Sequence, residues 1–477
     1  MKKIGNVLFI TACLLVCMIP FAAMTFASTQ TTTENREMAQ FPQLKEDGTW
    51  NQEYLQELGA YFEDHFAFRP ALVMADSVIQ SRVFGVSNMD TVIVGDEGWL
   101  YYTATLGDYQ GTNCMSDRSI YNAAHNLSLM QDYVQQRGAE FLLTIAPNKN
   151  SLYGENMPYY YQKKVSDNKN LDMLEPQLEK YGIVYTDLYD VFASQDEILY
   201  LKRDSHWNQK GAVLAYNTIL DDLECEHETY ETVSNVRTKT EYGDLNKMIY
   251  PVSGVPEWNY CYQKEQQFTY VTDTESVEDA WIETANDAGE GSLLMFRDSF
   301  GNTLLPLMAD VFEKGYFSKS QPYKIETYMK EYTPEYVVVE KVERNISEFA
   351  MMPPIMTGPV VELQQSPEFI QTGTTIEMKE SEADSDYWEI SGLVDDQYVK
   401  VDTNIYINMI SDGCVTCYEA FTVTKDSADC GYQLYIPKNN IASEDVGMEI
   451  LIESDGVIQK VATQEINMNE LRIANEG

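Results

Sequence analysis

Short apolar segments alternate with longer amphipathic ones through the middle of this chain, and that alternation restricts its fold more than any other feature. Residues 140–146 and 292–296 are almost entirely apolar, and each is followed by polar residues and then by a helical pattern. A strand that is apolar on both sides is typical of a parallel sheet buried between layers of helices. The alternation therefore predicts an α/β fold, with a parallel sheet covered by helices on both faces.

The other periodic segments extend this prediction along the chain. Amphipathic spacing and glycine stops indicate helices, and short β-branched or aromatic runs indicate strands. We expect helices over 119–137, 170–181, 211–223 and 302–312, strands over 183–188 and 335–340, and a hairpin over 91–102. Residues 225–288 interrupt the alternation with turn-rich sequence, and we interpret them as an insertion that covers one edge of the site.

The chain is long enough for more than one domain, because 477 residues exceed a single ordinary core. Beyond residue 360 it consists of short alternating strands, such as 400–407 and 432–436, split by Asp, Ser and Gly turns. This pattern predicts a small all-β sandwich, which suits a carbohydrate-binding module or a spacer equally. We expect a signal or anchor at 1–27, a linker at 28–50, an α/β domain at 51–352 that includes the 225–288 insertion, and the sandwich at 360–477.

The N-terminus begins with two lysines and continues as an almost unbroken apolar run to Ala27. Such a run describes an export signal with cleavage before Ser28. It is also long enough to span a bilayer, so an uncleaved membrane anchor is the alternative. A lipoprotein cleavage box around Cys13 fits less well, because the longer apolar stretch follows it. We expect the protein at the extracellular face of a membrane, or secreted.

The excess of acidic residues bears on the partners of the chain. It has 33 basic and 75 acidic residues, a formal net charge of −42 and no long basic run, which argues against a nucleic-acid partner. The scattered Asp and Glu residues lack the spacing of metal ligands. We expect neither a metal nor a cofactor.

Six of the eight cysteines lie beyond the N-terminal run, and an even number in an exported chain permits disulfides. Cys414 and Cys417 have the CxxC spacing of metal and redox sites. No second CxxC and no clustered histidine accompany them. A structural disulfide or free thiols is therefore the favoured interpretation.

Asp204 and His206 are the strongest candidates for chemistry. An aspartate two residues before a histidine can hold the imidazole in one tautomer, which allows it to activate a hydroxyl nucleophile. The other histidines are His65, His125 and His227, so few residues compete for the role of base. The alternative is a loop histidine packed under Trp207.

Two further strand ends carry polar residues, and ligands of open parallel sheets bind at that edge. Ser299 follows the strand 292–296, where its hydroxyl and N–H can serve as nucleophile and oxyanion donor, or its side chain can cap the next helix. Asn148 and Lys149 follow the strand 140–146, as oxyanion or substrate contacts or as ordinary turn residues. The remaining candidates for substrate or oxyanion binding are Trp207, Arg297 and Asn302.

Asp204-Ser205-His206-Trp207 followed by Asp298-Ser299-Phe300 resembles the AlgX/AlgJ alginate O-acetyltransferase family, which has an SGNH-hydrolase-like fold, and its Gram-positive "DHHW" relatives. In that family the Asp-x-His motif precedes the serine, as it does here. Further similar stretches occur in the same order at 34–36 with 41–42, 61–69, 95–101, 147–149 and 243–245. Two departures are an Arg-Asp-Ser block in place of Gly-Asp-Ser and a C-terminal region that matches no specific sugar-binding module.

The resemblance implies a triad in which Ser299 is the nucleophile, His206 the general base and Asp204 its orienting acid. Ser299 would take an acetyl group and pass it to a polysaccharide hydroxyl, with a membrane-bound O-acyltransferase as the supplier of acetyl groups. Two alternatives are a carbohydrate acetylesterase that uses the same triad with water, and a non-catalytic glycan-binding surface protein.

Overall fold

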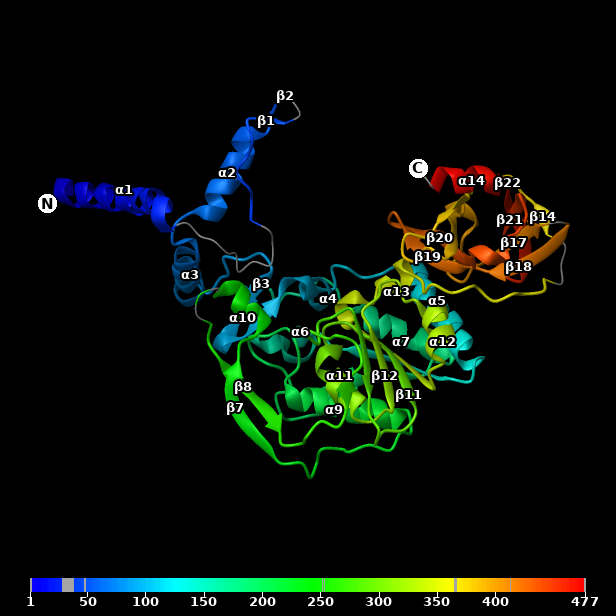
Figure 1. Ribbon diagram of the computed structural model, residues 1–477, viewed down its shortest axis with the longest axis horizontal. Coiled ribbons are helices and arrows are strands. Elements are labelled where there is room, and N and C mark those ends of the chain that lie inside the picture. Colours follow the sequence, from blue (N-terminus) through cyan, green and yellow to red (C-terminus); the bar gives the residue numbers. More distant parts are fainter. Residues whose placement is uncertain are drawn as a thin grey trace.

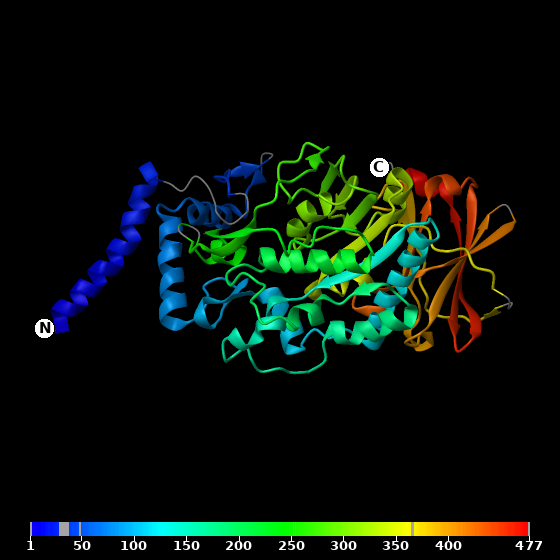
Figure 2. The ribbon, with the colours of Figure 1, turned by 90° about the horizontal axis from the view of Figure 1, so that it is seen from below.

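The computed structural model describes residues 2–27, 38–46, 49–250, 252, 254–363, 367–411 and 413–475. The motif at 34–36 and part of the expected linker lie outside the described residues. The chain begins with α1 (Lys2–Ala27), which contains the stretch Ile4–Met24, long and apolar enough to cross a membrane. Figures 1 and 2 show α1 extending away from the rest of the molecule. A signal sequence has the same character, so both interpretations of the N-terminus stand.

A central sheet of seven strands occupies the middle of the molecule (Figure 1). In spatial order the strands are β6 (Tyr185–Thr186), β5 (Glu140–Ala146), β13 (Tyr336–Val342), β11 (Ser292–Phe296), β12 (Lys314–Ser318), β10 (Trp281–Ala285) and β9 (Thr269–Tyr270). The first five are mutually parallel, as expected. β10 runs antiparallel to β12, and β9 runs antiparallel to β10, so the sheet is mixed at one edge.

The stretch 225–288 contributes to the sheet as well as interrupting it. It supplies β9 and β10, which extend the sheet, and β8 (Glu257–Tyr262), which pairs with β7 (Asn235–Glu241) in a separate hairpin. In β10 only Ile282 and Thr284 are fully buried, which is the alternation of an edge strand covered on one side. The interpretation of 225–288 as an insertion alone was therefore incomplete.

Helices cover both faces of the sheet, as the alternation predicts. In β5 the side chains of Phe141, Leu143 and Ile145 enter one apolar cluster, and those of Leu142 and Ala146 enter another. The first cluster is completed by α5 (Asp117–Gln135), α7 (Asn170–Tyr181), α12 (Ile325–Tyr332) and α13 (Glu348–Met351). The second is completed by α8 (Leu188–Ala193), α9 (Gln209–Asp222) and α11 (Gly301–Ala309).

Most predicted elements lie within a few residues of the observed ones. The expected strand 183–188 shortens to β6 because Asp187 accepts a hydrogen bond from the Asp190 backbone N–H and so begins α8. β12 and α12 were not predicted. β12 has the sequence Lys-Gly-Tyr-Phe-Ser, which lacks an apolar run, and its Gly315 leaves no room for a Cβ beside Phe317.

Smaller elements lie before and beside the sheet. The predicted hairpin at 91–102 is observed as β3 (Val92–Val94) paired with β4 (Leu100–Tyr102). The remaining elements of the N-terminal part and of the site region are β1 (Lys45–Glu46), β2 (Thr49–Trp50), α2 (Tyr54–His65), α3 (Arg69–Ile79), α4 (Leu106–Gln110), α6 (Lys149–Tyr153) and α10 (Asp244–Ile249).

The C-terminal region forms two stacked sheets, as the sequence predicts. One has the order β14 (Glu368–Phe369), β22 (Val457–Asn467), β21 (Asp445–Ser454), β17 (Asn404–Ser411), β18 (Cys414–Glu419). The other has the order β15 (Glu377–Glu380), β16 (Tyr387–Leu393), β20 (Ala428–Pro437), β19 (Phe421–Lys425). Their facing side chains share one apolar cluster, and α14 (Met468–Asn475) follows the last strand.

Helix α5 joins the two parts of the molecule, and Figure 2 shows the C-terminal sheets beside it. Sixteen of its 19 residues are buried, because one side packs on the central sheet and the other on β19 and β20. Arg118 is only 7% exposed and donates hydrogen bonds to the backbone carbonyls of Val401, Thr403 and Asp429. A buried guanidinium that satisfies three buried carbonyls fixes the C-terminal part on the helix.

We predict that Arg118→Ala destabilises the protein by about 2–4 kcal/mol, because it leaves buried carbonyl groups without donors. Chemical unfolding followed by circular dichroism measures this. The matched control is Arg137→Ala, at the exposed end of the same helix, where the guanidinium bonds only the Tyr133 carbonyl. Equal losses from both substitutions would contradict the prediction.

Candidate active site

The three predicted triad residues meet at the carboxyl edge of the central sheet. The turn after β11 carries Ser299, and the loop between α8 and α9 carries Asp204 and His206. His206 Nε2 lies 2.8 Å from Ser299 Oγ, and its Nδ1 lies 2.6 Å from Asp204 Oδ1. This is the hydrogen-bonded order that a nucleophile, a base and an orienting acid require. Their catalytic role stays a prediction.

The two alternatives drawn from the sequence do not describe these side chains. His206 contacts the ring of Phe300 with 4.8 Å between ring centroids, while Trp207 is buried and donates from Nε1 to Thr303 Oγ1 at 2.6 Å. The Ser299 hydroxyl bonds the imidazole, and the N-cap residue of α11 is Phe300, which makes no side-chain cap.

Lys149 holds the Asp204–His206 loop through its backbone carbonyl groups. The side chain is 4% exposed, and its ammonium group donates hydrogen bonds to the carbonyls of Leu201, Lys202 and Asp204. Burial lowers the pKa of Lys149 to about 8, against the opposing effect of nearby carboxylates such as Asp204. Lys149 therefore supports the loop and does not face a substrate directly.

Two carboxylates hold the N–H groups of the same loop. Glu257, at the start of β8, accepts the backbone N–H of Lys202 at 2.8 Å and that of Arg203 at 3.0 Å. Asp244, at the start of α10, accepts the backbone N–H of Ser205 at 2.7 Å and also its hydroxyl. The N–H groups bonded by Glu257 and Asp244, and the carbonyl groups bonded by Lys149, are thus satisfied by charged side chains from elsewhere in the chain. These bonds give the loop one conformation.

The turn that carries Ser299 is fixed by buried acids. Asp298 accepts the backbone N–H groups of Phe300 and Val342, each at 2.8 Å, and donates its own N–H to Glu340 at 3.0 Å. A Cβ at position 301 would lie 2.6 Å from Arg297 Cβ, so only glycine allows the turn to pass so closely. Ser299 itself stays partly exposed at the top of the turn.

Charge around the imidazole favours its protonated form. Burial alone would lower the pKa of His206, but the hydrogen bond and charge of Asp204, with the charges of Asp244 and Asp298, raise it above 6.5. Burial opposes ionisation of Asp204 too, yet the hydrogen bond and charge of His206 lower its pKa to about 2. Asp204 is therefore a carboxylate throughout the working pH range, and His206 is a strengthened base.

The other predicted contacts of oxyanion or substrate are buried in the protein. Asn148 is 1% exposed, its backbone N–H donates to Glu343 at 2.7 Å, and its amide nitrogen donates to Asp108 at 3.2 Å. Trp207 is likewise only 1% exposed. As placed here, these residues support the site from inside, and direct substrate contact by either of them stays a prediction.

Arg297 and Asn302 form a support on the other side of the serine turn. The guanidinium donates to Asn302 Oδ1 and to the carbonyls of Val277 and Asp279, and the Asn302 amide donates to Glu278 at 2.8 Å. Arg297 is 3% exposed and Asn302 9% exposed. Both bind the segment before β10 to the start of α11, and their predicted contact with a substrate or oxyanion stays a prediction.

Residues 92–288 match the family model described as "SGNH hydrolase-like domain, acetyltransferase AlgX". The resemblance to the AlgX family is confirmed over this stretch. The match includes Asp204, His206 and Asp244 and ends before Ser299, so only the geometry supports the prediction that Ser299 is the nucleophile. No curated protein matches the chain.

Several solved structures are similar to parts of the chain. PatB1 from Bacillus cereus, in a structure with a sulfonyl adduct, is 15% identical, covers 55% of this chain and 97% of its own, and has a TM-score of 0.44. A DHHW family protein from Eubacterium siraeum is 15% identical, with coverages of 55% and 93% and a TM-score of 0.42. The O-acetyltransferase domain of Pseudomonas putida AlgJ is 16% identical, with coverages of 54% and 92% and a TM-score of 0.38.

Three residues that shape the AlgX-like site were not among the predicted site residues. Asp244 lay in a stretch whose family resemblance was noted, but no role was given to it. Glu257 and Glu340 gave no signal, because each acts on backbone groups far away in the sequence. Only the folded structure brings such pairs together.

One group of possible metal ligands within the described residues shares Asp204 and His206 with the triad. Ligand atoms of Asp204, His206 and Asp244 all lie within 4.8 Å of one another. Nδ1 of His206 is already bonded to Asp204, and Oδ2 of Asp244 to the Ser205 hydroxyl. A metal ion would have to replace these bonds, so the donor set fits a hydrogen-bonded relay better than a metal site.

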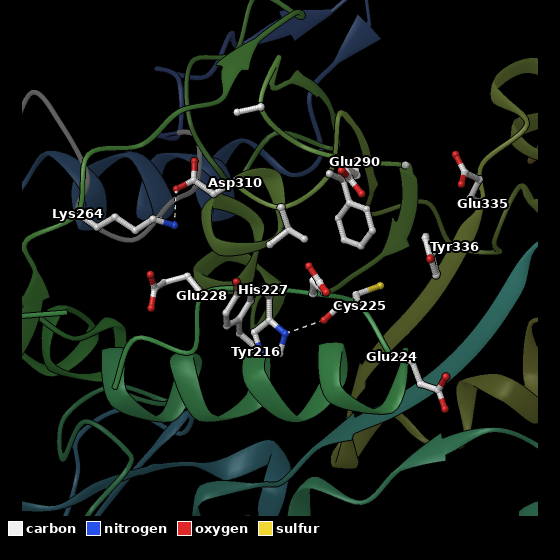
Figure 3. A pocket seen from close by; sticks show the side chains of 15 residues that line it. Tyr216, Glu224, Cys225, His227, Glu228, Lys264, Glu290, Asp310, Glu335 and Tyr336 are labelled. Carbon is white, nitrogen blue, oxygen red and sulfur yellow. Dashed lines mark hydrogen bonds and ion pairs between the residues drawn. The ribbon is translucent and has the colours of Figure 1, made fainter. Parts of the chain in front are cut away.

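A separate pocket of about 540 Å³ opens at the opposite edge of the sheet (Figure 3). Gly291 and Tyr336, beside the amino ends of β11 and β13, line it together with Glu224, His227 and Asp310. Asp310 pairs there with Lys264 at 3.3 Å. Since chemistry in open parallel sheets occurs at the carboxyl edge, this pocket is not the candidate active site.

The raised pKa of His206 predicts the pH dependence of Ser299 reactivity. Only the neutral imidazole accepts the serine proton, so labelling of Ser299 by a fluorophosphonate should increase with pH through a midpoint above 6.5. The Ser299→Ala variant, which cannot be labelled, is the control. A midpoint at or below 6.5 would contradict the assignment of His206 and its acidic neighbours.

Loss of the Lys149 ammonium should loosen the loop. We predict that Lys149→Met lowers kcat for an activated acetyl ester by about 10- to 100-fold with little change in KM, because displacement of the base misaligns the relay. The control is Lys210→Met, which removes an ion pair with Glu197 on the surface of α9. An unchanged kcat in Lys149→Met would show that the loop needs no such support.

Proposed function

We propose that this protein is an exported O-acetyltransferase that moves an acetyl group through a seryl ester onto hydroxyl groups of a polysaccharide. The observation that carries the proposal is the Ser299–His206–Asp204 relay at the carboxyl edge of the sheet. The match of residues 92–288 to an acetyltransferase family model supports the reaction class.

In the first half-reaction His206 takes the proton of Ser299 Oγ, and the oxygen attacks the carbonyl carbon of an acetyl ester. The bond to the donor oxygen then breaks, and His206 returns the proton to that leaving oxygen. Asp204 stabilises the imidazolium that forms in between, since its carboxylate stays ionised. The product is acetyl-Ser299 and a free donor alcohol.

The second half-reaction repeats these steps with the acceptor. His206 removes a proton from a sugar hydroxyl, and that oxygen attacks the seryl ester and releases Ser299. We expect the backbone N–H of Ser299, at the entrance to α11, to donate to the oxyanion of both steps. The proposed acceptor is a cell-surface or secreted polysaccharide.

The N-terminal helix fits a location outside the cytoplasm. The stretch Ile4–Met24 suits an anchor or a signal, and either places the AlgX-like part at the outer face of a membrane or beyond it. A membrane-bound O-acyltransferase is the proposed supplier of acetyl groups, because free acetyl donors such as thioesters are made inside cells.

A carbohydrate acetylesterase is the second candidate. The same relay activates water as readily as a sugar hydroxyl, and the His206 side chain is 22% exposed, so water reaches it. A purely glycan-binding role is less well supported, because binding alone requires no hydrogen bond from His206 to Ser299.

Incubation of the purified protein with an acetyl donor, with and without oligosaccharides, separates these functions. Acetylated sugar supports transfer, and acetate alone supports the esterase. We predict that Ser299→Ala lowers either activity at least about a thousandfold while the unfolding transition is retained. The matched control is Ser194→Ala, at the exposed end of α8, which should retain full activity. Undiminished turnover by Ser299→Ala would contradict the proposal.

A further inference from the structure

Asp244 places a second carboxylate beside the candidate base, and its contacts converge on the residue between Asp204 and His206. Its Oδ1 accepts the Ser205 backbone N–H at 2.7 Å, and its Oδ2 accepts the Ser205 hydroxyl. Its own backbone N–H donates to Asp204 Oδ2 at 2.9 Å. These bonds connect the start of α10 to Ser205 and to the carboxylate of Asp204. Asp204 therefore cannot turn without moving Asp244.

The same carboxylate is close to the imidazole itself. Asp244 Oδ2 lies 3.8 Å from His206 Nδ1, against 2.6 Å for Asp204 Oδ1. The longer distance excludes a direct hydrogen bond but lies within the range of an ion pair. The Ser205 hydroxyl fills part of the interval, because its oxygen lies 3.3 Å from the same Nδ1.

We propose that Asp244 is a second acidic partner of the catalytic imidazole, a positioning residue that holds the Asp204–His206 loop through Ser205 and shares the positive charge of His206 with Asp204. Ser205 is then part of this clamp and not a bystander between two triad residues. The inference rests on the proposed function, since a strengthened base matters where His206 acts as one.

The effect of Asp244 on the pKa of His206 can be separated from the effects of the other acidic groups nearby. The acidic groups that face the imidazole are Asp204 and Asp244 from the loop side, Asp298 from the serine turn, and Glu278 from the segment before β10. Lys149 faces the loop carbonyls beneath Asp204. Asp244→Asn removes one of these charges and leaves the others, and an asparagine oxygen can still accept the Ser205 N–H.

The direct test is titration of His206 by NMR in protein labelled with ¹⁵N-histidine. The chain has only four histidines, so His206→Gln assigns the signal. We expect Asp244→Asn to lower the pKa of His206 by about 0.5 to 1 unit, as removal of a nearby opposite charge does, and Asp244→Glu to restore it. Asp445→Asn, a charge-matched substitution in β21, should leave it unchanged.

A second variant keeps the test decisive if Asp244→Asn loses its native histidine signals. Ser205→Ala removes the hydroxyl bond but keeps the Asp244 charge, so the pKa of His206 should stay at or above that of the wild type. An unchanged pKa in a folded Asp244→Asn, or an equal decrease in Ser205→Ala, would overturn the proposal.

Activity gives an independent readout. With an activated acetyl ester, Asp244→Asn should lower kcat about threefold to tenfold with KM retained, and should cost more in an Asp204→Asn background, where Asp244 is the remaining acid. If the losses of kcat from the two substitutions are strictly additive in free energy, this would count against a positive charge on His206 that Asp204 and Asp244 share. The titration needs no substrate, so absence of Ser299-dependent turnover would overturn the proposed function without deciding the role of Asp244.

Discussion

The conformation of the loop 201–206 is the constraint on which the rest of the site depends. Its backbone has no regular partner strand over most of its length. Three charged side chains bond several of its polar groups, and the backbone N–H groups of Leu100 and Asn246 bond two of its carbonyls. Lys149 takes carbonyls, while Glu257 and Asp244 take N–H groups. Because each comes from the start of a different element, α6, β8 and α10, the fold must form completely before His206 faces Ser299.

The central sheet positions the other half of the candidate site, which is the turn that carries Ser299. β11 and β5 are buried strands whose ends bring Ser299 and Lys149 to one edge, and β13 between them supplies Glu340, which accepts the Asp298 N–H. Helix α5 then couples the sheet to the C-terminal sandwich through Arg118. The sandwich is therefore held against the part that contains the central sheet by buried contacts of α5.

The sequence was informative where local pattern and burial agree. The strands 140–146 and 292–296 and the helix 170–181 are observed with the predicted bounds, and Ser299 follows the second of these strands. β12, with a glycine and a lysine among five residues, has no such pattern. The hydrogen bonds of Asn148 and Arg297 could not be predicted, because their partners, Asp108 and the carbonyls before β10, lie far away in the chain. Asp244 and Glu257 are of the same kind, since their function exists only in contacts between distant segments.

The central claim is that Ser299 carries the acetyl group. The most direct measurement is mass spectrometry of peptides after rapid mixing of the protein with an acetyl donor in the absence of an acceptor. The account predicts one acetyl group on the peptide that contains Ser299, which disappears when an oligosaccharide acceptor is added and is absent in His206→Gln. An acetyl group at another residue, or turnover without any acetylated Ser299, would contradict it.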